Sequence, residues 1–501
     1  MSKPPKIFLQ AAVVTFLLVT IIFFSFNSVD LCAGTDSSSH RVLTVPTTSF
    51  PTLSSAIASA SSGDTVFVKN GTYNEQPLTL TKTVNIVGEN PNGTVVIFHS
   101  ILTMKEVQSP GMIAAHINGL FLPFWSDILN ITAAGAAFSN LALKAEQGGG
   151  IVVDGDDTQF IGTYIDCDSI SGLGNRAQII NNTITGRVGL SGSNLTLAGN
   201  DCGHAIILGG SNNTVVRNRV GSQIECYHGS FNIVADNTVG YWVKVGSFSV
   251  VIGNNVSSGA DGGLWLEGSG SFVAKNSFTG GISVNGSNSN IISNSAGWLN
   301  IQGSNNIFCA DAVAGYNQTS KSAIKYTTSS APYAISLGTP YNSVLYGNPV
   351  IITENNTFFK NNFLGNTQLR IWAGAENNSF WHDGQGNYWS DYQGSDANGD
   401  GVGDSAYHLD ARDRDFEVIT NSSVSDDYPL MAPFNGTVRI QLPDWAQTVL
   451  PWYSVESDQL ASDNSQVNLV IYIATALIAI GAMAAVFFVS KKRSQKESPK
   501  L

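Results

Sequence analysis

The sequence predicts an all-β protein, a right-handed parallel β-helix (solenoid), and three observations lead to this fold class. The first is a repeat with a spacing of 17–22 residues between Ala177 and Ser304. The second is the content of each repeat: apolar-x-x-Asn-x-apolar, then apolar-x-apolar, then Gly-Ser. The third is composition, because 43% of the 501 residues are apolar and only 12% are charged. Coils of this kind must stack, since no single coil can bury its own apolar face.

The repeat indicates which residues align from coil to coil. The key asparagines are expected to form one column, namely Asn181, Asn200, Asn218, Asn237, Asn254, Asn276 and Asn294. Because side chains alternate along a strand, the apolar-x-apolar phrase places two columns inside the solenoid. The first inward column is Val188, Ile206, Ile224, Val243, Leu264, Ile282 and Leu299, and the second is Leu190, Leu208, Cys226, Val245, Leu266, Val284 and Ile301.

A short helix is expected to cover the first coil. Phe50, Leu53, Ile57 and Ala60 lie on one face of this helix, and Gly63 ends it. The exposed first strand of a solenoid is open to pairing with other chains, so a helix that covers it removes that risk.

The β-helix is predicted to span residues 42–363. Its period lapses near 101–137 and near 312–348, which indicates two insertions. Residues 364–433 are expected to form a C-terminal cap with a calcium-type loop. Residues 434–466, which contain Pro, Trp and Ser, are expected to form an extracellular stalk.

Both ends of the chain carry apolar segments. Residues 1–33 are expected to be a signal peptide or an N-terminal membrane anchor, because residues 7–26 contain no charge. Residues 467–489 are expected to be a transmembrane helix and the basic residues 490–501 a cytoplasmic tail. The expected location is therefore the cell membrane, with a single C-terminal span and the β-helix outside.

The charge of residues 27–489, most of which are expected to lie outside the cell, restricts the partners that this part of the chain can bind. Without residues 1–26 (two basic) and 490–501 (five basic, one acidic), 18 basic and 36 acidic residues remain, a net charge of −18. Such a surface repels nucleic acid and suits cations and neutral or basic partners. Thirteen Asn-x-Ser/Thr sequons in this part are consistent with an exported glycoprotein.

Several motifs resemble a known family. The sequence of residues 63–73, Gly-Asp-Thr-Val-Phe-Val-Lys-Asn-Gly-Thr-Tyr, resembles the entry of pectate-lyase-like β-helix proteins. The repeats, together with residues 386–392, 396–404 and 427–431, resemble the NosD-like family of extracytoplasmic β-helix proteins, in the pattern shared by many archaeal surface proteins. The resemblance implies the fold. It also raises a copper-handling role, because one branch of that family assists copper-site maturation of nitrous oxide reductase.

One acidic segment predicts a structural calcium site. Asp396, Asn398, Asp400 and Asp404 supply side-chain oxygens at loop positions 1, 3, 5 and 9, and Val402 offers a carbonyl at position 7. This spacing, with Gly401 at position 6, matches the first part of an EF-hand-type loop. Tyr407 stands where a bidentate Glu is expected, so a last ligand must come from Asp410, Asp413 or Asp415. A solvated acidic turn is the alternative interpretation.

A second constellation lies on the outer face and predicts carbohydrate binding. Between the inward columns, Glu225, Lys244 and Trp265 form an outward row on successive coils. The neighbouring candidates are Tyr227, Trp242, Glu267 and Trp298. Aromatic rings stack on sugar faces, and carboxylates accept hydroxyl protons. Aromatic stacking for stability alone is the alternative. Ser283 continues the row, and we expect Asp to be tolerated there.

Catalysis is a rival hypothesis. Glu225 and Glu267 are the candidate carboxylates for a polysaccharide lyase or glycoside hydrolase. The His204 coil is similar to a strand of β-helix polygalacturonases, yet the preceding coil has no acid. Acids including Asp166 and Asp168 could serve a lyase, but the sequence offers them no evident basic partner.

Copper handling is the third hypothesis. Two Cys-x-His pairs mix the soft and imidazole ligands that copper prefers, Cys202 with His204 and Cys226 with His228. The repeat alignment turns Cys226 into the core, which argues against a copper site. The leading hypothesis is therefore a membrane-anchored surface protein that binds polysaccharide or glycoprotein glycans, or is structural, with calcium as a stabilising ion.

Overall fold

The computed structural model describes residues 40–100, 102–106, 121–257, 262–314, 335–337, 352–365, 369–371, 375–409, 411–412 and 424–453. The described residues from Val42 to Tyr453 belong to one compact unit. The predicted signal or anchor, transmembrane segment and basic tail lie outside the described residues. Within the described ranges, no helix has the length and apolar character that a membrane crossing requires.

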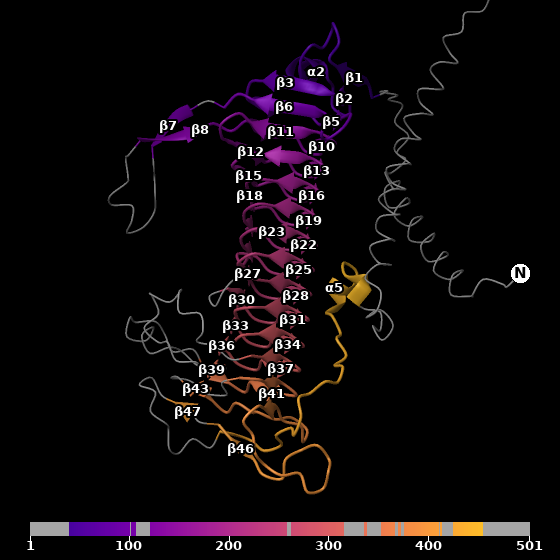
Figure 1. Ribbon diagram of the computed structural model, residues 1–501. Helices are drawn as coiled ribbons and strands as arrows, with labels where there is room; N and C mark the ends of the chain where they lie inside the picture. The colour runs from indigo at the N-terminus through magenta and orange to yellow at the C-terminus, as the bar shows by residue number, and fades with distance from the viewer. Residues whose placement is uncertain are drawn as a thin grey trace, which may run out of the picture. The chain divides into compact units, whose positions relative to one another are not determined.

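The fold is a right-handed parallel β-solenoid of three 14-stranded sheets (Figure 1). Sheet A contains β1 (Val42–Val45), β2 (Thr65–Val68), β5 (Asn85–Gly88), β10 (Ala137–Ser139), β13 (Gln159–Ile161), β16 (Gln178–Ile180), β19 (Thr196–Ala198), β22 (Thr214–Val216), β25 (Ile233–Ala235), β28 (Val250–Ile252), β31 (Phe272–Ala274), β34 (Asn290–Ile292), β37 (Ile307–Cys309) and β41 (Thr357–Phe359). Sheet B contains β3 (Gly71–Glu75), β6 (Thr94–Phe98), β11 (Ala142–Ala145), β14 (Tyr164–Asp166), β17 (Thr183–Ile184), β20 (Asp201–Cys202), β23 (Arg219–Val220), β26 (Thr238–Val239), β29 (Asn255–Val256), β32 (Ser277–Phe278), β35 (Ser295–Ala296), β38 (Ala312–Val313), β42 (Asn362–Phe363) and β45 (Tyr388–Trp389). Sheet C contains β4 (Leu78–Leu80), β9 (Leu129–Ile131), β12 (Gly150–Val153), β15 (Ser169–Gly172), β18 (Arg187–Leu190), β21 (Ile206–Leu208), β24 (Ile224–Cys226), β27 (Trp242–Val245), β30 (Gly263–Leu266), β33 (Gly281–Val284), β36 (Leu299–Ile301), β39 (Ile335–Leu337), β43 (Leu369–Ile371) and β47 (Ala411–Arg412).

Three short strand pairs lie outside these sheets. They are the antiparallel pair β7 (Leu102–Glu106) and β8 (Phe121–Trp125), the parallel pair β40 (Thr353–Glu354) and β44 (Ala375–Glu376), and the antiparallel pair β46 (Tyr407–His408) and β48 (Ser425–Asp426).

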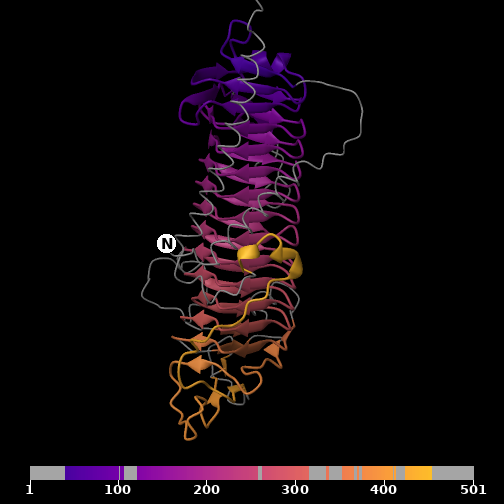
Figure 2. The ribbon, with the colours of Figure 1, turned by 90° about the vertical axis from the view of Figure 1, so that its right-hand side faces the viewer.

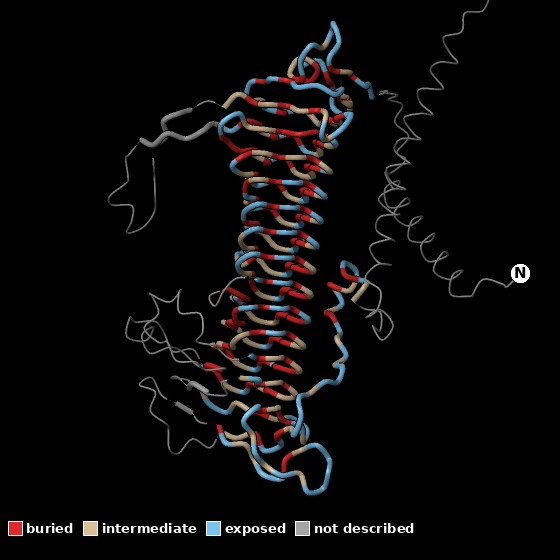
Figure 3. The backbone as a smooth tube through the Cα atoms, in the orientation of Figure 1, coloured by how far each residue is buried: buried red, intermediate tan, exposed pale blue. Residues whose placement is uncertain are grey.

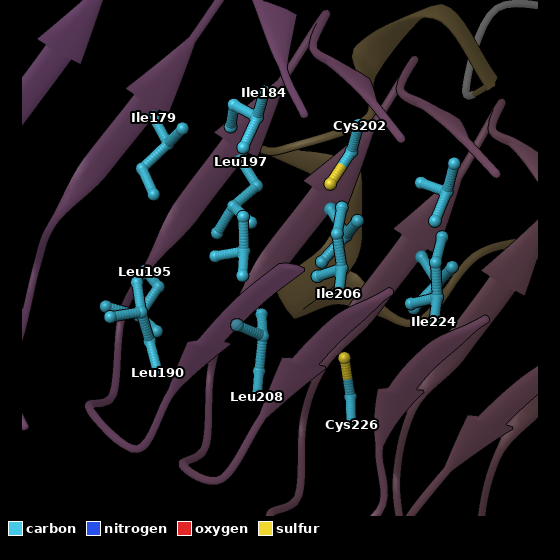
Figure 4. Close-up of a cluster of buried hydrophobic side chains, with 14 of the residues drawn as sticks. Ile179, Ile184, Leu190, Leu195, Leu197, Cys202, Ile206, Leu208, Ile224 and Cys226 are labelled. Atoms are coloured by element: carbon cyan, nitrogen blue, oxygen red, sulfur yellow. The ribbon is translucent and has the colours of Figure 1, made fainter. Parts of the chain in front are cut away.

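The two predicted inward columns are confirmed. Val188 aligns with Ile206, Ile206 with Ile224, and the column continues in register to Leu299. All members of both columns are buried. Figure 3 shows that buried residues, in red, recur on successive coils. In the close-up, Cys202 and Cys226 occupy core positions among Ile and Leu side chains (Figure 4). Stacked aliphatic side chains therefore form one continuous core along the coils.

A buried asparagine ladder joins the coils at the turn from sheet A to sheet B. The backbone N–H and the Nδ2 of each member both donate to Oδ1 of the next, for example Asn200 to Asn218 at 2.9 and 2.8 Å. Six of the seven predicted asparagines belong to this column. The prediction of Asn181 is wrong by one residue, because Asn182 is the buried ladder member and Asn181 is exposed. The residue that precedes the ladder position takes a left-handed conformation, with φ 55° at Asn181, which Asn tolerates.

The predicted N-terminal cover is α2 (Leu53–Ser59), whose buried face is Leu53, Ala56 and Ile57. Thr52 begins the helix with a capping box. Glu75 of the first sheet B strand accepts from the backbone N–H of Leu53 at 2.7 Å, which places a carboxylate at the helix N-terminus. Helix and first coil are thus joined by one buried acid.

The limits of the solenoid differ from the prediction at three places. Sheet C resumes at Leu129 and sheet A at Ala137, so the coils return before the first predicted insertion ends. Ile335–Leu337 belongs to sheet C inside the second predicted insertion. The stack also continues past residue 363, because β45 and β47 pair in register with sheets B and C. The predicted cap therefore contains the last coil.

Part of the predicted stalk packs on the solenoid. The chain leaves the C-terminal cap at Phe434, which exchanges two hydrogen bonds with Asn362. It then runs back along sheet A through α5 (Asp444–Gln447) and the 3₁₀ turn Pro451–Tyr453 (Figure 2). We call residues 440–453 the strap. Residues 454–466 of the predicted stalk lie outside the described residues.

Candidate functional site

The predicted outer row exists on sheet C. Glu225, Lys244 and Trp265 are paired in register on three successive strands, β24, β27 and β30. They point outward because the residues on either side of each one face the core. Neighbouring strands are about 4.8 Å apart, so the row presents one side chain about every 4.8 Å.

Side-chain contacts hold this row in a fixed arrangement. Trp242 Nε1 donates to Glu225 Oε1 at 3.0 Å. Lys244 Nζ lies 3.3 Å from Glu267 Oε1 and 4.3 Å from the centroid of the Tyr227 ring. A ligand would therefore meet groups whose positions are already set, which lowers the ordering cost of binding.

Trp265 is the most available ring of the row, with 39% of its surface exposed. Tyr227 contacts Lys244 and Trp242 contacts Glu225, so both aromatic residues touch members of the row.

Trp298 lies at the far end, separated from Trp242 by two glycines. Trp242 aligns with Gly263, and Gly263 aligns with Gly281. The ring of Trp298 covers Gly281 so closely that a Cβ on that glycine would meet it at 2.0 Å. The glycine pair thus leaves the edge of sheet C without side chains between two indoles.

Ser283 is a correction to the predicted outward row. It aligns with Trp265 on one side and Asn300 on the other, as expected. However, Ser283 is only 4% exposed, and Asn300 Nδ2 donates to its Oγ at 3.3 Å. A charge at Ser283 would be buried, so the expectation that Asp is tolerated there is wrong.

A cavity of about 430 Å³ opens where sheet B turns into sheet C, on coils that precede the outer row. Its lining includes Glu146, Asp166, Asp168 and His204, which come from three separate segments of the chain. Thr185 Oγ1 donates to Asp166 Oδ1 at 2.8 Å. The backbone N–H of Gly149 donates to Asp168 Oδ2 at 2.8 Å, and His99 Nδ1 lies 2.7 Å from Glu146 Oε2.

The sequence analysis identified Asp166 and Asp168 as candidate acids, but it did not predict that they line a cavity together with His204. Asp166 and His204 are 38 residues apart in the sequence, and only the stacking of coils brings them together. Lys144 pairs in register with Asp166, which places a basic residue on the strand next to this acid. The Nζ of Lys144 lies 5.2 Å from the Tyr164 ring centroid.

The predicted calcium loop forms a compact turn. The Asp396 carboxylate accepts from the backbone N–H of Gly399 and Gly401 at 2.7 and 2.9 Å, and Asp404 accepts from Ala397 at 2.8 Å. Gly401 has φ 85°, as the sharp turn at position 6 requires.

The loop oxygens currently bind backbone donors of the loop itself. In the described part of the chain, no three His, Cys, Asp or Glu side chains come together as a metal-ligand group. The proposed additional ligands Asp410, Asp413 and Asp415 lie outside it.

The Cys-x-His pairs do not converge. Cys202 belongs to a core column of sheet B and Cys226 to one of sheet C. Burial raises the pKa of the Cys202 thiol to about 11 and that of Cys226 to about 12, so both remain protonated. His204 and His228 are exposed. The cysteines act as small core hydrophobes, as the repeat predicts.

No family model matches this sequence. Two curated relatives are similar over a short stretch. The probable ABC transporter binding protein NosD of Stutzerimonas stutzeri is 32% identical over 105 residues, covering 16% of this chain and 24% of the relative. Its namesake in Pseudomonas aeruginosa is 33% identical over 99 residues, covering 20% and 21%. The similarity thus spans about a quarter or less of either relative, and neither supports the archaeal type.

Solved structures with similar coils share little sequence. The catalytic domain of a GH87 α-1,3-glucanase in complex with nigerose has a TM-score of 0.40 and 13% identity, covering 71% of this chain and 70% of that domain. The A-module of the Azotobacter vinelandii mannuronan C-5 epimerase AlgE4 has a TM-score of 0.30 and 11% identity, covering 65% and 86%.

Proposed function

We propose that the protein is a membrane-anchored, extracytoplasmic β-helix that binds extended carbohydrate along the outer row of sheet C. The observation that carries this proposal is the preordered row itself, in which Trp242 is bonded to Glu225, and Lys244 is bonded to Glu267 beside the exposed Trp265. The net charge of −18 favours neutral or basic glycans over acidic ones.

Each component of the row has a role in this proposal. Trp265 and Tyr227 stack on sugar faces, while Glu225, Glu267 and Lys244 bond to hydroxyl groups. The glycine pair between Trp242 and Trp298 is not a sugar subsite in this proposal, because the Trp298 ring covers Gly281 and both glycines are buried. A polymer lying along the row would contact several coils at once.

A glycan array probed with the full chain in detergent tests the proposal. Trp265→Ala should weaken binding of any hit by roughly 1–2 kcal/mol, the scale of one aromatic contact with its buried area. Tyr164→Ala is the matched control, because Tyr164 is an outward aromatic on sheet B. Equal losses for both variants, or no hit on the array, would refute carbohydrate binding by this row and leave a structural surface protein.

An enzymatic function is the second candidate, and the cavity favours it. Asp166 and Asp168 lie there with His204, so one recess holds two carboxylates, the groups that glycoside hydrolases use, and an imidazole that could act as a general acid or base. A reducing-sugar assay on the array hits separates binding from cleavage. Loss of cleavage in Asp168→Asn would assign catalysis to the cavity, whereas loss in Glu225→Gln or Glu267→Gln would assign it to the outer row.

A further inference from the structure

The strap occupies a site that the sequence of sheet A builds for it. One outward position on this sheet carries Gln159, Gln178, Thr196 and Thr214 on four successive coils. The next three coils carry Ile233, Val250 and Phe272 there, and the following one returns to Asn290. Leu442, Ala446 and Leu450 of the strap are buried against this apolar patch.

The turns on both sides of the patch also depart from the repeat. At the turn from sheet A to sheet B, Asp236 accepts hydrogen bonds from Tyr453 Oη and, at 3.1 Å, from Trp452 Nε1. Arg217 lies 4.2 Å over the Trp452 ring. Gly253 leaves room for the Tyr453 hydroxyl, which a Cβ would meet at 2.0 Å. The end of the strap is therefore held at one place on the solenoid.

At the opposite turn, two phenylalanines stand where the coils directly before and after them have Asn212 and Gly270. Phe231 and Phe248 have φ 58° and 52°, a left-handed conformation that is strained for a bulky residue, whereas Asn212 and Asn288 hold the equivalent turns. Their rings stack at 5.1 Å, and Trp445 meets Phe231 edge-on at 5.7 Å. Phe231, Phe248 and Val449 remain 41%, 47% and 38% exposed. Phe231 and Phe248 keep a strained backbone although their rings stay exposed. We take this as a sign that the rings contact something outside the chain.

The position of the strap decides where the solenoid is tethered. Thirteen residues separate Tyr453 from the apolar segment 467–489, a reach of about 45 Å at full extension. The strap lies along the sheet A strands β25–β31, and sheet C lies on the other side of the coil (Figure 1). A tether that starts on this flank allows sheet A to face the bilayer while sheet C faces away.

We infer that the strap-bearing flank, formed by Phe231, Phe248, Trp445 and Val449, rests on the lipid bilayer surface, with the carbohydrate-binding row facing outward. The inference depends on the membrane anchor of the proposed function but not on carbohydrate binding. Aromatic side chains favour the membrane–water interface, where their rings leave water while neighbouring polar groups stay hydrated. The occupant is therefore a lipid surface.

Lipid quenching in vesicles tests this orientation. The full chain with Cys32→Ser is reconstituted into phosphatidylcholine vesicles that contain a lipid spin-labelled near the headgroup. A bimane group is attached at Phe248→Cys, where its ring replaces the phenyl ring, or at Arg187→Cys on sheet C. The four described native cysteines are buried and do not compete for the label. We expect loss of fluorescence at position 248 and none at position 187.

Two further variants separate the strap from the exposed rings. Ala446→Asp places a carboxylate on the apolar patch and should abolish the difference between positions 248 and 187, whereas Gln441→Asp, exposed on the same segment, should preserve it. Phe231→Asn installs the residue that other coils use, so it should reduce quenching without lowering the melting temperature.

Two results would overturn the inference. One is equal quenching of the labels at positions 248 and 187 in the parent protein. The other is a difference in quenching between these positions that remains in Ala446→Asp. A label at position 248 that is shielded without lipid quenching would indicate a second copy of the chain on this flank instead. Failure of the full chain to float with vesicles would remove the anchor, while glycan binding in the same preparation would still report on the outer row.

Discussion

At the scale of single residues, Asp311 breaks the chemistry of the asparagine ladder. Its Oδ1 accepts from Asn294 as an asparagine would, but its buried Oδ2 has no hydrogen-bond partner. An amide at this position would donate, as Asn294 Nδ2 does to the carbonyl of Val273. A carboxylate can imitate that donor only when it is protonated. Burial raises the pKa of Asp311 well above its ordinary value, so the neutral form is the one that suits the fold.

Asp311→Asn should therefore stabilise the protein at neutral pH. The change supplies the missing donor and removes a buried acid, with an expected gain of about 1–3 kcal/mol in the free energy of unfolding. Chemical denaturation at pH 7 measures it. Asn276→Asp is the matched control, because it introduces the same acid into a ladder position that now holds an amide, and it should destabilise the fold by a similar amount.

The pH dependence of this effect has a definite sign. Because the folded-state pKa of Asp311 is raised, its contribution is fully present below the unfolded pKa and is lost as pH rises toward the folded value. The advantage of Asp311→Asn should accordingly shrink as pH falls toward 4. A gain that is the same at pH 4 and pH 7 would show that the carboxyl does not titrate as we describe.

The inward columns make a second prediction at this scale. Val243→Asp places an unpaired carboxylate in a stack that excludes water, and should cost several kcal/mol of folding free energy. Ser277→Asp, at an exposed position of sheet B, is the control and should change stability little. Thermal melts of the two variants compare them directly. Similar melting temperatures would mean that the faces of the strands are wrongly assigned.

The repeat predicts the residues of the core columns correctly but misplaces one residue of the asparagine ladder. Apolar alternation has a period of two, so one wrong residue would have exposed a whole column, and both columns were predicted correctly. The first asparagine was not, because the column was begun at Asn181, although Ile179 and Ile184 stand at the apolar positions of the phrase around Asn182. The hydrogen bonds agree with that phrase, because Asn182 is the ladder member and Asn181 is the left-handed turn residue before it.

At the scale of elements, the C-terminal cap ends the ladder with a second acid. Asp426 Oδ2 accepts from Asn387 and from Trp389 Nε1 at 2.9 Å, joining the last coil to the short strand β48. Burial raises the pKa of Asp426 to about 6. The extent of this coil escaped prediction because β45 and β47 have two residues each and the repeat phrase is absent from them.

The calcium loop of the cap leads to a prediction about thermal stability. If Asp396, Asn398 and Asp400 bind calcium as their spacing predicts, a chelator should lower the melting temperature, and Asp400→Ala should remove that response. Asp383→Ala, an exposed acid of the cap outside the loop, should retain it. Identical melting curves with and without chelator would leave a solvated turn that is held by its own backbone hydrogen bonds.

At the scale of the whole molecule, the strap could not be predicted from local sequence. Its residues lie about 200 positions from the coils they cover, and a Pro- and Trp-containing stretch suits a stalk equally well. The part of the sequence that indicates the strap is sheet A. One outward position of this sheet is polar on the earlier coils and becomes Ile233, Val250 and Phe272 on the coils that the strap covers. An interruption in an outward row indicates a cover but does not identify it.

The strap should also make the stability of the solenoid uneven along its length. Coils in a solenoid depend mainly on their neighbours, so a local cover protects the coils beneath it more than distant ones. Burial of Leu442 and Leu450 contributes on the order of 1.5–3 kcal/mol each. In Ala446→Asp, amide hydrogen exchange should quicken in β25, β28 and β31 but not in β13 and β16 of the same sheet. Gln441→Asp should leave both groups unchanged. Uniform acceleration along sheet A would instead mean that the strap stabilises the stack as one cooperative unit, and unchanged exchange would mean that it contributes nothing.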